Sequence, residues 1–138
     1  IANVARGTWY LTKLVLRRFM MRKGTGRIIN ITSVVGHTGN AGQIPYTMVK
    51  AGLDAFTKSL TQELTGRDIL VNSIAPGFVE TEMTDDLPEE IQQQILAKVP
   101  LGRVAQADEI ADVVAFLATR GSYIHGSVLH VNGGMYGG

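Results

Sequence analysis

The sequence predicts an α/β fold built on a parallel sheet. Three short apolar runs, at residues 27–32, 69–75 and 127–132, have the length and β-branched content of buried strands. Segments with the period of helices separate these runs, and helices that alternate with apolar strands favour a parallel sheet. The 138 residues, of which 45% are apolar, are enough to bury one core.

The first two elements are a helix over residues 4–21 and a strand over residues 27–32. The apolar residues of the helix recur at spacings of three and four, and they are Trp9, Leu11, Leu14, Val15, Phe19 and Met20. A basic, Gly-rich turn at residues 22–26 ends the helix. The strand is a β-branched run between glycines, which predicts burial on both of its faces.

A loop over residues 33–44 leads to a second helix, residues 45–64, which has a proline in its first turn. The apolar face of this helix consists of Tyr46, Val49, Leu53, Phe56, Leu60 and Leu64. The next element is the strand at residues 69–75, and Pro76-Gly77 breaks it. This strand is expected to be buried.

The remaining chain contains a polar stretch, a helix and a strand. Within the polar residues 78–101, a helical pattern spans residues 88–98. The helix predicted at residues 108–119 has a core face made of Ile110, Val113, Val114, Phe116 and Leu117. The last strand, residues 127–132, ends at two glycines.

Composition excludes several classes of function. Thirteen Lys and Arg against twelve Asp and Glu leave a net charge of +1, which gives no electrostatic footprint for nucleic acid. No apolar run approaches the roughly 18 residues of a membrane span. Zero cysteines exclude disulfides and Cys-ligated metals and fit a cytosolic compartment. His37 and His130 have no partners at ligand spacing, so we expect a loop and a strand histidine and no metal site.

The sheet predicted from these patterns is thin. It has three strands, and the sequence contains no G-x-G-x-x-G turn between a strand and a helix and no P-loop. Two explanations remain open at this point. Either the protein does not bind a nucleotide, or the residues given are part of a longer domain.

Tyr46 and Lys50 form the sharpest candidate for chemistry. Residues four apart on a helix lie one above the other, so the phenol and the ammonium share a face. A cation beside a phenol favours the phenolate and suits a tyrosine to general acid–base catalysis near neutral pH. The spacing alone is also that of an ordinary surface pair on a helix.

Two further segments converge on the same edge of the sheet. Ser33 follows the first strand, Pro76-Gly77 follows the second, and ligands bind at the carboxyl ends of parallel strands. A serine hydroxyl there would hydrogen-bond a substrate carbonyl while Tyr46 delivers the proton. Three signals at one edge favour a catalytic site over a loop serine and a surface tyrosine.

Residues 31–36, 46–52 and 71–81 (ITSVVG, YTMVKAG and VNSIAPGFVET) resemble the C-terminal half of a short-chain dehydrogenase/reductase. The resemblance covers essentially the whole chain. It implies a Rossmann-like three-layer α/β/α fold with a parallel sheet, from which the N-terminal strands and the Gly-rich cofactor turn are absent. Residues 1–138 would then be the catalytic and substrate-binding part of a single reductase domain.

Within that family, residues 78–84, 99–103 and 129–136 are most similar to members that reduce 3-oxoacyl thioesters of acyl carrier protein in fatty acid synthesis. The resemblance implies an NADPH-dependent oxidoreductase. Tyr46 would protonate the ketone, Lys50 would bind the nicotinamide ribose, and Ser33 would hold the substrate oxygen.

The same resemblance implies the remaining site residues. Thr81 and the backbone at Pro76, Gly77 and Val79 would contact the nicotinamide carboxamide, while Asn3 is the candidate for the family's proton-relay asparagine. No metal is implied. Without a dinucleotide cradle, these 138 residues alone are expected to be inactive.

The resemblance also implies partners, and it leaves alternative functions open. Helices 4–21 and 45–64 resemble the family's dimer interface, the C-terminal strand resembles a second contact, and a cytoplasmic homotetramer is expected. A basic cluster at Arg17, Arg18, Arg22, Lys23 and Arg27 either is a solvated helix end or, beside Arg67, attracts the acidic carrier protein. The rival functions are reduction of steroids, sugars or small alcohols and ketones, and a non-catalytic scaffold.

Overall fold

The computed structural model describes residues 2–137, except for the side chains of Ala2 and Met83. Its elements alternate between helices and strands, as the sequence predicts. In chain order they are α1 (Ala2–Val15), the π-helical turn η1 (Leu16–Met20), α2 (Met21–Lys23), β1 (Thr25–Ile31), α3 (Val35–Thr38), α4 (Ile44–Glu63), β2 (Asp68–Pro76), α5 (Glu82–Asp85), α6 (Glu89–Ala97), α7 (Ala107–Thr119) and β3 (Val128–Val131).

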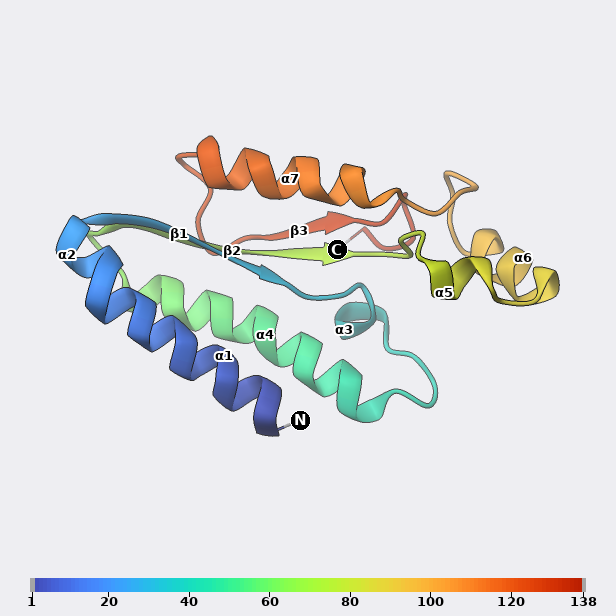
Figure 1. The fold of residues 1–138 in the computed structure, drawn as a ribbon, viewed down its shortest axis with the longest axis horizontal. Helices are drawn as coiled ribbons and strands as arrows, with labels where there is room; N and C mark the ends of the chain where they lie inside the picture. Colours follow the sequence, from blue (N-terminus) through green and yellow to red (C-terminus); the bar gives the residue numbers. More distant parts are fainter. Residues whose placement is uncertain (1, 138) are drawn as a thin grey trace.

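The three strands form a parallel sheet in the order β1-β2-β3, with β2 in the middle. Ile31 of β1 pairs with Ile74 of β2, and Ile74 pairs with Leu129 of β3. All three strands therefore end at the same edge, where α3, α5 and α6 lie (Figure 1). The predicted parallel α/β fold is confirmed.

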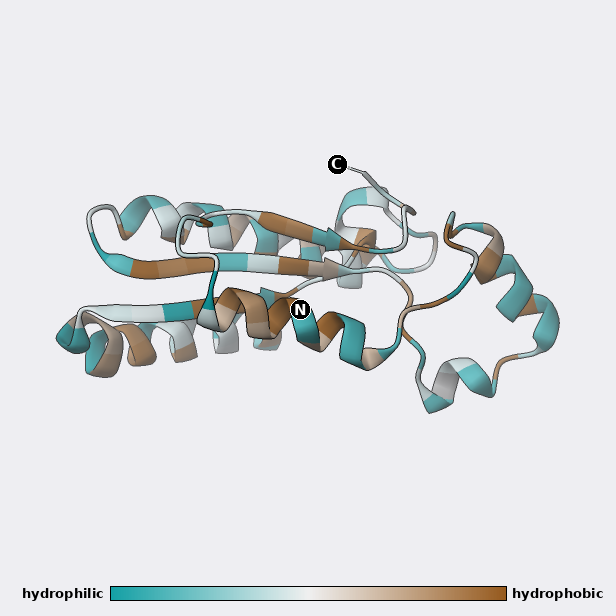
Figure 2. Ribbon diagram, turned by 90° about the horizontal axis from the view of Figure 1, so that it is seen from above, coloured by the Kyte–Doolittle hydropathy of each residue, from teal (hydrophilic) through white to brown (hydrophobic). Residues whose placement is uncertain are grey.

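Helices cover both faces of the sheet. α1 and α4 lie on one face and α7 lies on the other, which gives three layers (Figure 1). Figure 2 shows long hydrophobic stretches in the strands, whereas hydrophilic and hydrophobic residues alternate along the helices. This distribution is typical of a parallel sheet that buries both faces under amphipathic helices.

The main core lies between β2, the helical turn η1 and α4. Its buried residues are Leu16, Leu60, Leu64, Ile69 and Val71, and the partly buried Met20, Ile28 and Phe56 pack against them. The side chains of Val71 and Ile74 are 0% exposed. The central strand is therefore buried along almost its whole length, as its apolar run predicts.

The first predicted strand is less buried than expected. Every residue of β1 is partly or fully exposed, because β1 is an edge strand that pairs only with β2 among the described residues. Burial on both faces of this strand was therefore a wrong expectation. A β-branched run indicates a strand but does not say how many neighbours the strand has.

The first predicted helix also departs from the expected burial. α1, η1 and α2 form one helical segment that ends at Gly24, whose φ of 82° requires glycine. The side chains of Trp9, Leu11 and Phe19 are exposed, although the helical period places them on an apolar face. Among residues 2–137, no helix is long and apolar enough to cross a membrane.

Candidate active site

The backbone on either side of Ser33 is bound to β2. The Thr32 amide donates to the Ile74 carbonyl at 2.8 Å, and the Val34 amide donates to the Pro76 carbonyl at 2.9 Å. These two bonds continue the parallel ladder just past the end of β1. Ser33 is consequently held at the carboxyl edge of the sheet, beside Pro76.

A cavity of about 490 Å³ opens at this edge. Its lining includes Ser33, Tyr46, Gly77 and Val79, so it brings together four of the residues expected to form the site. The Ser33 hydroxyl accepts a hydrogen bond from the Val35 amide at 3.2 Å. Its own proton remains available to donate to a ligand in the cavity.

Tyr46 and Lys50 lie one turn apart near the N-terminal end of α4. α4 has a proline in its first turn, a position that favours the start of a helix. Tyr46 follows this proline directly and lines the cavity. The Lys50 ammonium lies 5.4 Å from the centroid of the Tyr46 ring and donates to the Ile31 carbonyl at 3.4 Å. The end of β1 thus holds the ammonium beside the phenol, as the spacing of four predicts.

Val79 lines the cavity and is held beside Ala105 by the backbone bonds of its two chain neighbours. Val79 forms a parallel bridge with Ala105, in which the Phe78 carbonyl accepts from Ala105 and the Glu80 amide donates to Ala105. These bonds leave the Val79 amide and carbonyl without a partner among the described residues. An adjacent donor and acceptor of this kind match a carboxamide group.

The segment that carries Ala105 is fixed by an ion pair. The Arg103 guanidinium binds both carboxylate oxygens of Glu109, at 2.6 and 2.9 Å. This hydrogen-bonded arginine, together with the Gln106 amide, lowers the pKa of Glu109 to about 2. The Glu109 carboxylate therefore stays ionised over the physiological range of pH, in an ion pair that is exposed to solvent.

Thr81 and Asn3 do not line the cavity. Thr81 begins α5, and its hydroxyl accepts from the Thr84 amide at 3.2 Å in a reciprocal capping box. Asn3 is exposed on the first turn of α1, and no hydrogen bond of its side chain is found within residues 2–137. Their expected roles in cofactor contact and proton relay remain predictions.

Besides Thr38, sequence reasoning missed three polar residues at the cavity, Asn40, Gln43 and Lys98. Asn40 and Gln43 bond to each other at 2.7 Å in the loop before α4. Lys98 follows α6 and brings a positive charge to the lining. A signal for all three existed in their position in loops after the strand ends, where ligand-binding residues of parallel sheets lie.

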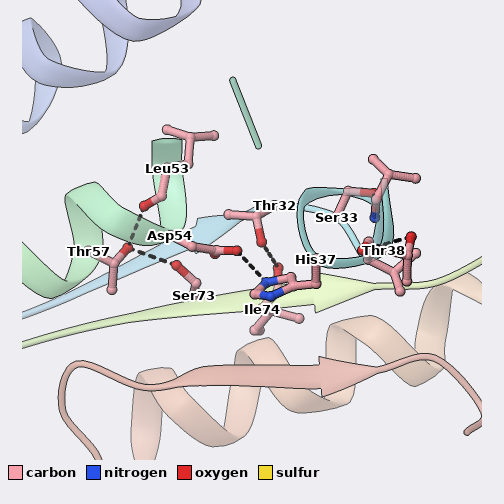
Figure 3. A network of polar contacts seen from close by, with 11 residues as sticks. Thr32, Ser33, His37, Thr38, Leu53, Asp54, Thr57, Ser73 and Ile74 are labelled. Carbon is pink, nitrogen blue, oxygen red and sulfur yellow. Dashed lines mark hydrogen bonds and ion pairs between the residues drawn. The ribbon is translucent and has the colours of Figure 1, made fainter. Parts of the chain in front are cut away.

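A buried polar cluster next to the cavity was also missed. The His37 imidazole lies 2.7 Å from a carboxylate oxygen of Asp54, whose side chain is 5% exposed (Figure 3). The rings of His130 and Tyr136 pack against the His37 ring at centroid distances of 4.7 and 5.3 Å. His37 thus does have a carboxylate and a histidine partner. Within residues 2–137, however, no group of three or more His, Cys, Asp or Glu can hold a metal ion.

We expect His130 to make the protein sensitive to acid. Burial, and next the neighbouring His37, lower the pKa of His130 from 6.5. The folded protein therefore favours neutral His130, whereas the unfolded chain takes up a proton near pH 6.5. This contribution to the free energy of unfolding is present above that pH and is lost as the pH falls through the folded pKa.

The variant His130→Phe keeps a ring in the cluster and removes the titration. Urea unfolding at about pH 7 and about pH 5.5 should reveal a smaller loss of stability in the variant than in the wild type. Among the described residues, the buried His130 Nδ1 has no hydrogen-bond partner, so the substitution removes no hydrogen bond of that atom to them. An equal loss in both proteins would assign the acid sensitivity to other groups.

Comparisons with known proteins match nearly the whole chain. The family described as Enoyl-(Acyl carrier protein) reductase matches residues 1–136. The 3-oxoacyl-[acyl-carrier-protein] reductase FabG of Aquifex aeolicus is 53% identical over 131 residues, covering 94% of this chain and 52% of that protein. The FabG proteins of Salmonella typhimurium and Escherichia coli are 57% and 55% identical over 127 residues, covering 91% of this chain and 52% of each. The chain spans about half the length of these curated relatives.

Proposed function

This chain belongs to the short-chain dehydrogenase/reductase family, and on that premise we propose that it supplies the catalytic and substrate-binding part of a cytoplasmic NADPH-dependent 3-oxoacyl-acyl-carrier-protein reductase. The observation that carries the proposal is the cavity that joins Ser33 and Tyr46, with the Lys50 ammonium beside the phenol. The relatives named as 3-oxoacyl reductases, at 53–57% identity, support the choice of substrate.

The proposed mechanism divides three tasks among three side chains. The Ser33 and Tyr46 hydroxyls donate hydrogen bonds to the ketone oxygen of the substrate and orient its carbonyl. Tyr46 then transfers its proton to that oxygen as the carbonyl is reduced. The Lys50 ammonium, held at the end of β1, stabilises the phenolate that remains on Tyr46.

The residues present fit the nicotinamide end of a dinucleotide. The unpartnered Val79 amide and carbonyl match a carboxamide. The Lys50 ammonium offers a donor to ribose hydroxyls, and the Tyr46 oxygen, whose proton goes to the ketone, offers an acceptor. When bound, the nicotinamide supplies a hydride to the carbonyl carbon. A Gly-rich turn for the phosphates is not found in this sequence, so the cradle for the rest of the cofactor is proposed to lie in a further part of the reductase domain.

The proposal is tested by assaying the full protein that carries this chain. Acetoacetyl-acyl-carrier-protein should be reduced with NADPH, and NADH should support a lower rate. Enoyl thioesters, steroids, sugars and small ketones serve as competing substrates, because the family description names an enoyl substrate. Preference for one of these would replace the proposed substrate, and absence of both turnover and NADPH binding would favour a scaffold.

We propose that the acidic carrier protein binds a basic groove at the far end of α4. This groove has a volume of about 380 Å³. Its charged lining residues are the three cations Lys13, Arg17 and Arg67 and one acid, Glu63. Tyr46 and Glu63 are 17 residues apart on α4, so the groove lies about 25 Å from Tyr46 along the helix. In a twofold dimer with antiparallel α4 helices, the groove of one protomer would approach the cavity of its partner.

Charge reversal at Arg67 tests this surface. The variant Arg67→Glu should raise KM for the carrier-protein thioester about tenfold by repelling an acidic partner. KM for the corresponding coenzyme A thioester should stay unchanged. Added salt should narrow the difference in KM for the carrier-protein thioester between the variant and the wild type. The exposed Arg120 follows α7 on the opposite face, and Arg120→Glu is the matched control. Equal effects of the two substitutions would reject the groove as the docking surface.

The exposed apolar residues of α1 and α4 support the proposed homotetramer. Trp9, Leu11 and Phe19 are 47%, 63% and 66% exposed, and Met48 on α4 is 60% exposed. An apolar cavity of about 210 Å³ lies between these helices. An exposed patch of this kind is typical of a protein interface. The contact through the C-terminal strand rests on the family resemblance alone.

A further inference from the structure

The segment that carries Ser33 is packed tightly against α4 by its backbone. A Cβ at Gly36 would lie 3.0 Å from the Ala51 amide nitrogen and 3.2 Å from the Lys50 carbonyl carbon. α3 therefore approaches α4 as closely as a glycine allows, at the residue that carries the ammonium of the site. Ser33 precedes this contact by three residues, and Val34 and Val35 of the same segment line the cavity.

The His37–Asp54 pair is a second link between the same two elements. His37 is on α3, four residues after Ser33, and Asp54 is on α4, one turn after Lys50. Nε2 of His37 lies 2.7 Å from Oδ2 of Asp54 (Figure 3). The other oxygen, Oδ1, is buried without a partner in the described residues. His37 is consequently the only side chain found to satisfy this buried carboxylate.

The surroundings of His37 restrict its movement. The rings of His130 from β3 and Tyr136 from the C-terminal segment pack on the imidazole, and they also pack on each other at 5.0 Å. Displacement of α3 would break this packing and leave the buried Asp54 carboxyl without its hydrogen-bond partner, which is unfavourable. α3, and with it the backbone that follows Ser33, is thereby fixed relative to the α4 turn that presents Tyr46 and Lys50.

We propose that His37 and Asp54 are positioning residues, which set the distance between the Ser33 hydroxyl and the Tyr46 phenol without touching the substrate. This inference rests on the proposed reductase function and deepens it. Catalysis requires both hydroxyls within hydrogen-bonding distance of one carbonyl oxygen. A displacement of about 1 Å in such a group can lower the rate about 100-fold.

The test compares single and double variants in the full protein. Asp54→Asn and His37→Phe should each lower kcat for the 3-oxoacyl thioester about tenfold to 100-fold, with KM nearly unchanged. The double variant His37→Phe/Asp54→Leu replaces the buried pair by apolar groups and should regain thermal stability. It should not regain kcat, because apolar contact lacks the direction of a hydrogen bond. If the double variant recovers both thermal stability and kcat, the role of the pair is only structural, and the proposal is overturned.

Thr57→Val is the matched control. The Thr57 hydroxyl is also buried on α4, and it bonds to Asn30 of β1 at 2.9 Å and to Ser73 of β2 at 2.8 Å. Among the described residues, no hydrogen bond joins it to α3 (Figure 3). This variant should lose stability and keep kcat. A loss of kcat equal to that of Asp54→Asn would show that any damage to α4 slows the reaction, and it would overturn the positioning role.

A readout without turnover separates this inference from the proposed function. Amide resonances of Ser33, Val34 and Val35 should shift in the NMR spectrum of Asp54→Asn and stay in place in Thr57→Val. If the wild-type protein does not reduce 3-oxoacyl thioesters, the proposed function fails, while these shifts still report whether the pair positions Ser33. Unchanged resonances in Asp54→Asn would overturn the inference even if the enzyme is active.

Discussion

Replacing Tyr46 with Phe is expected to lower kcat for the 3-oxoacyl thioester by about 10²–10⁴-fold, the usual contribution of a positioned acid–base group. The substitution removes only the phenolic oxygen, which is the atom proposed to give a proton to the ketone. The hydroxyl makes no hydrogen bond to the other described residues, and the side chain is 45% exposed. Folding should therefore be unaffected. Steady-state rates with NADPH, together with circular dichroism, measure the two effects separately.

Lys50→Met tests whether the ammonium acts through the same phenol. Lys50 approaches the Tyr46 ring and the Ile31 carbonyl, so its loss should destabilise the phenolate left after proton transfer. The double variant Tyr46→Phe/Lys50→Met should then be little slower than Tyr46→Phe alone, because residues that act as a unit are not additive. Near-normal turnover of Tyr46→Phe would exclude Tyr46 as the acid. If the rate losses of the two single variants multiply in the double variant, Lys50 acts independently of the Tyr46 phenol.

The sequence predicted those parts of the site that depend on local spacing. Tyr46 and Lys50 share a helix face because they are four residues apart, and this follows from helix geometry alone. Ser33 follows a strand and Gly77 follows the neighbouring one, so a parallel sheet brings them to one edge in any register. These relations need no knowledge of tertiary packing. Ser33, Tyr46 and Gly77 line one cavity, whereas Lys50 is not among its lining residues.

The His37 cluster depends on packing and could not be predicted in the same way. Asp54 is 17 residues from His37 along the chain, and His130 belongs to a strand on the other side of β2. Their meeting requires the strand order, the β2–β3 register and the turn of α3 at once. No periodicity in the sequence encodes these three features together.

The hydrophobic pattern predicted burial correctly only for those apolar residues that belong to the core of this chain. The run in β2 is buried because the middle strand of a sheet has neighbours on every side. Trp9 and Phe19 satisfy the same hydrophobic pattern, yet they are exposed in the isolated chain. Hydrophobic periodicity indicates that one face of a helix is buried, but it does not distinguish burial in a core from burial in an interface with another protomer.

Replacing Asn72 with Leu is expected to lower the free energy of unfolding by about 2–4 kcal/mol, since it leaves two backbone groups unpaired. Asn72 interrupts the apolar run of β2 and is 3% exposed. Its amide donates to the Ile124 carbonyl at 3.0 Å, and its carbonyl oxygen accepts from the Ser127 amide at 3.0 Å. The side chain thereby binds both ends of the turn that leads into β3. Urea unfolding of the full protein measures the effect.

The loss should extend from this turn to the catalytic edge. β3 pairs with β2 over only four residues, and its last residue, Val131, accepts a bond from the Gly77 amide at 3.0 Å. Loosening of β3 should therefore speed hydrogen exchange at Gly77, which lines the cavity. Ile74→Val is the comparison, because removing one buried methylene costs about 0.5–1.5 kcal/mol and breaks no hydrogen bond. If Asn72→Leu were no more destabilising than Ile74→Val and left Gly77 protected, the turn would be held by its backbone bonds alone.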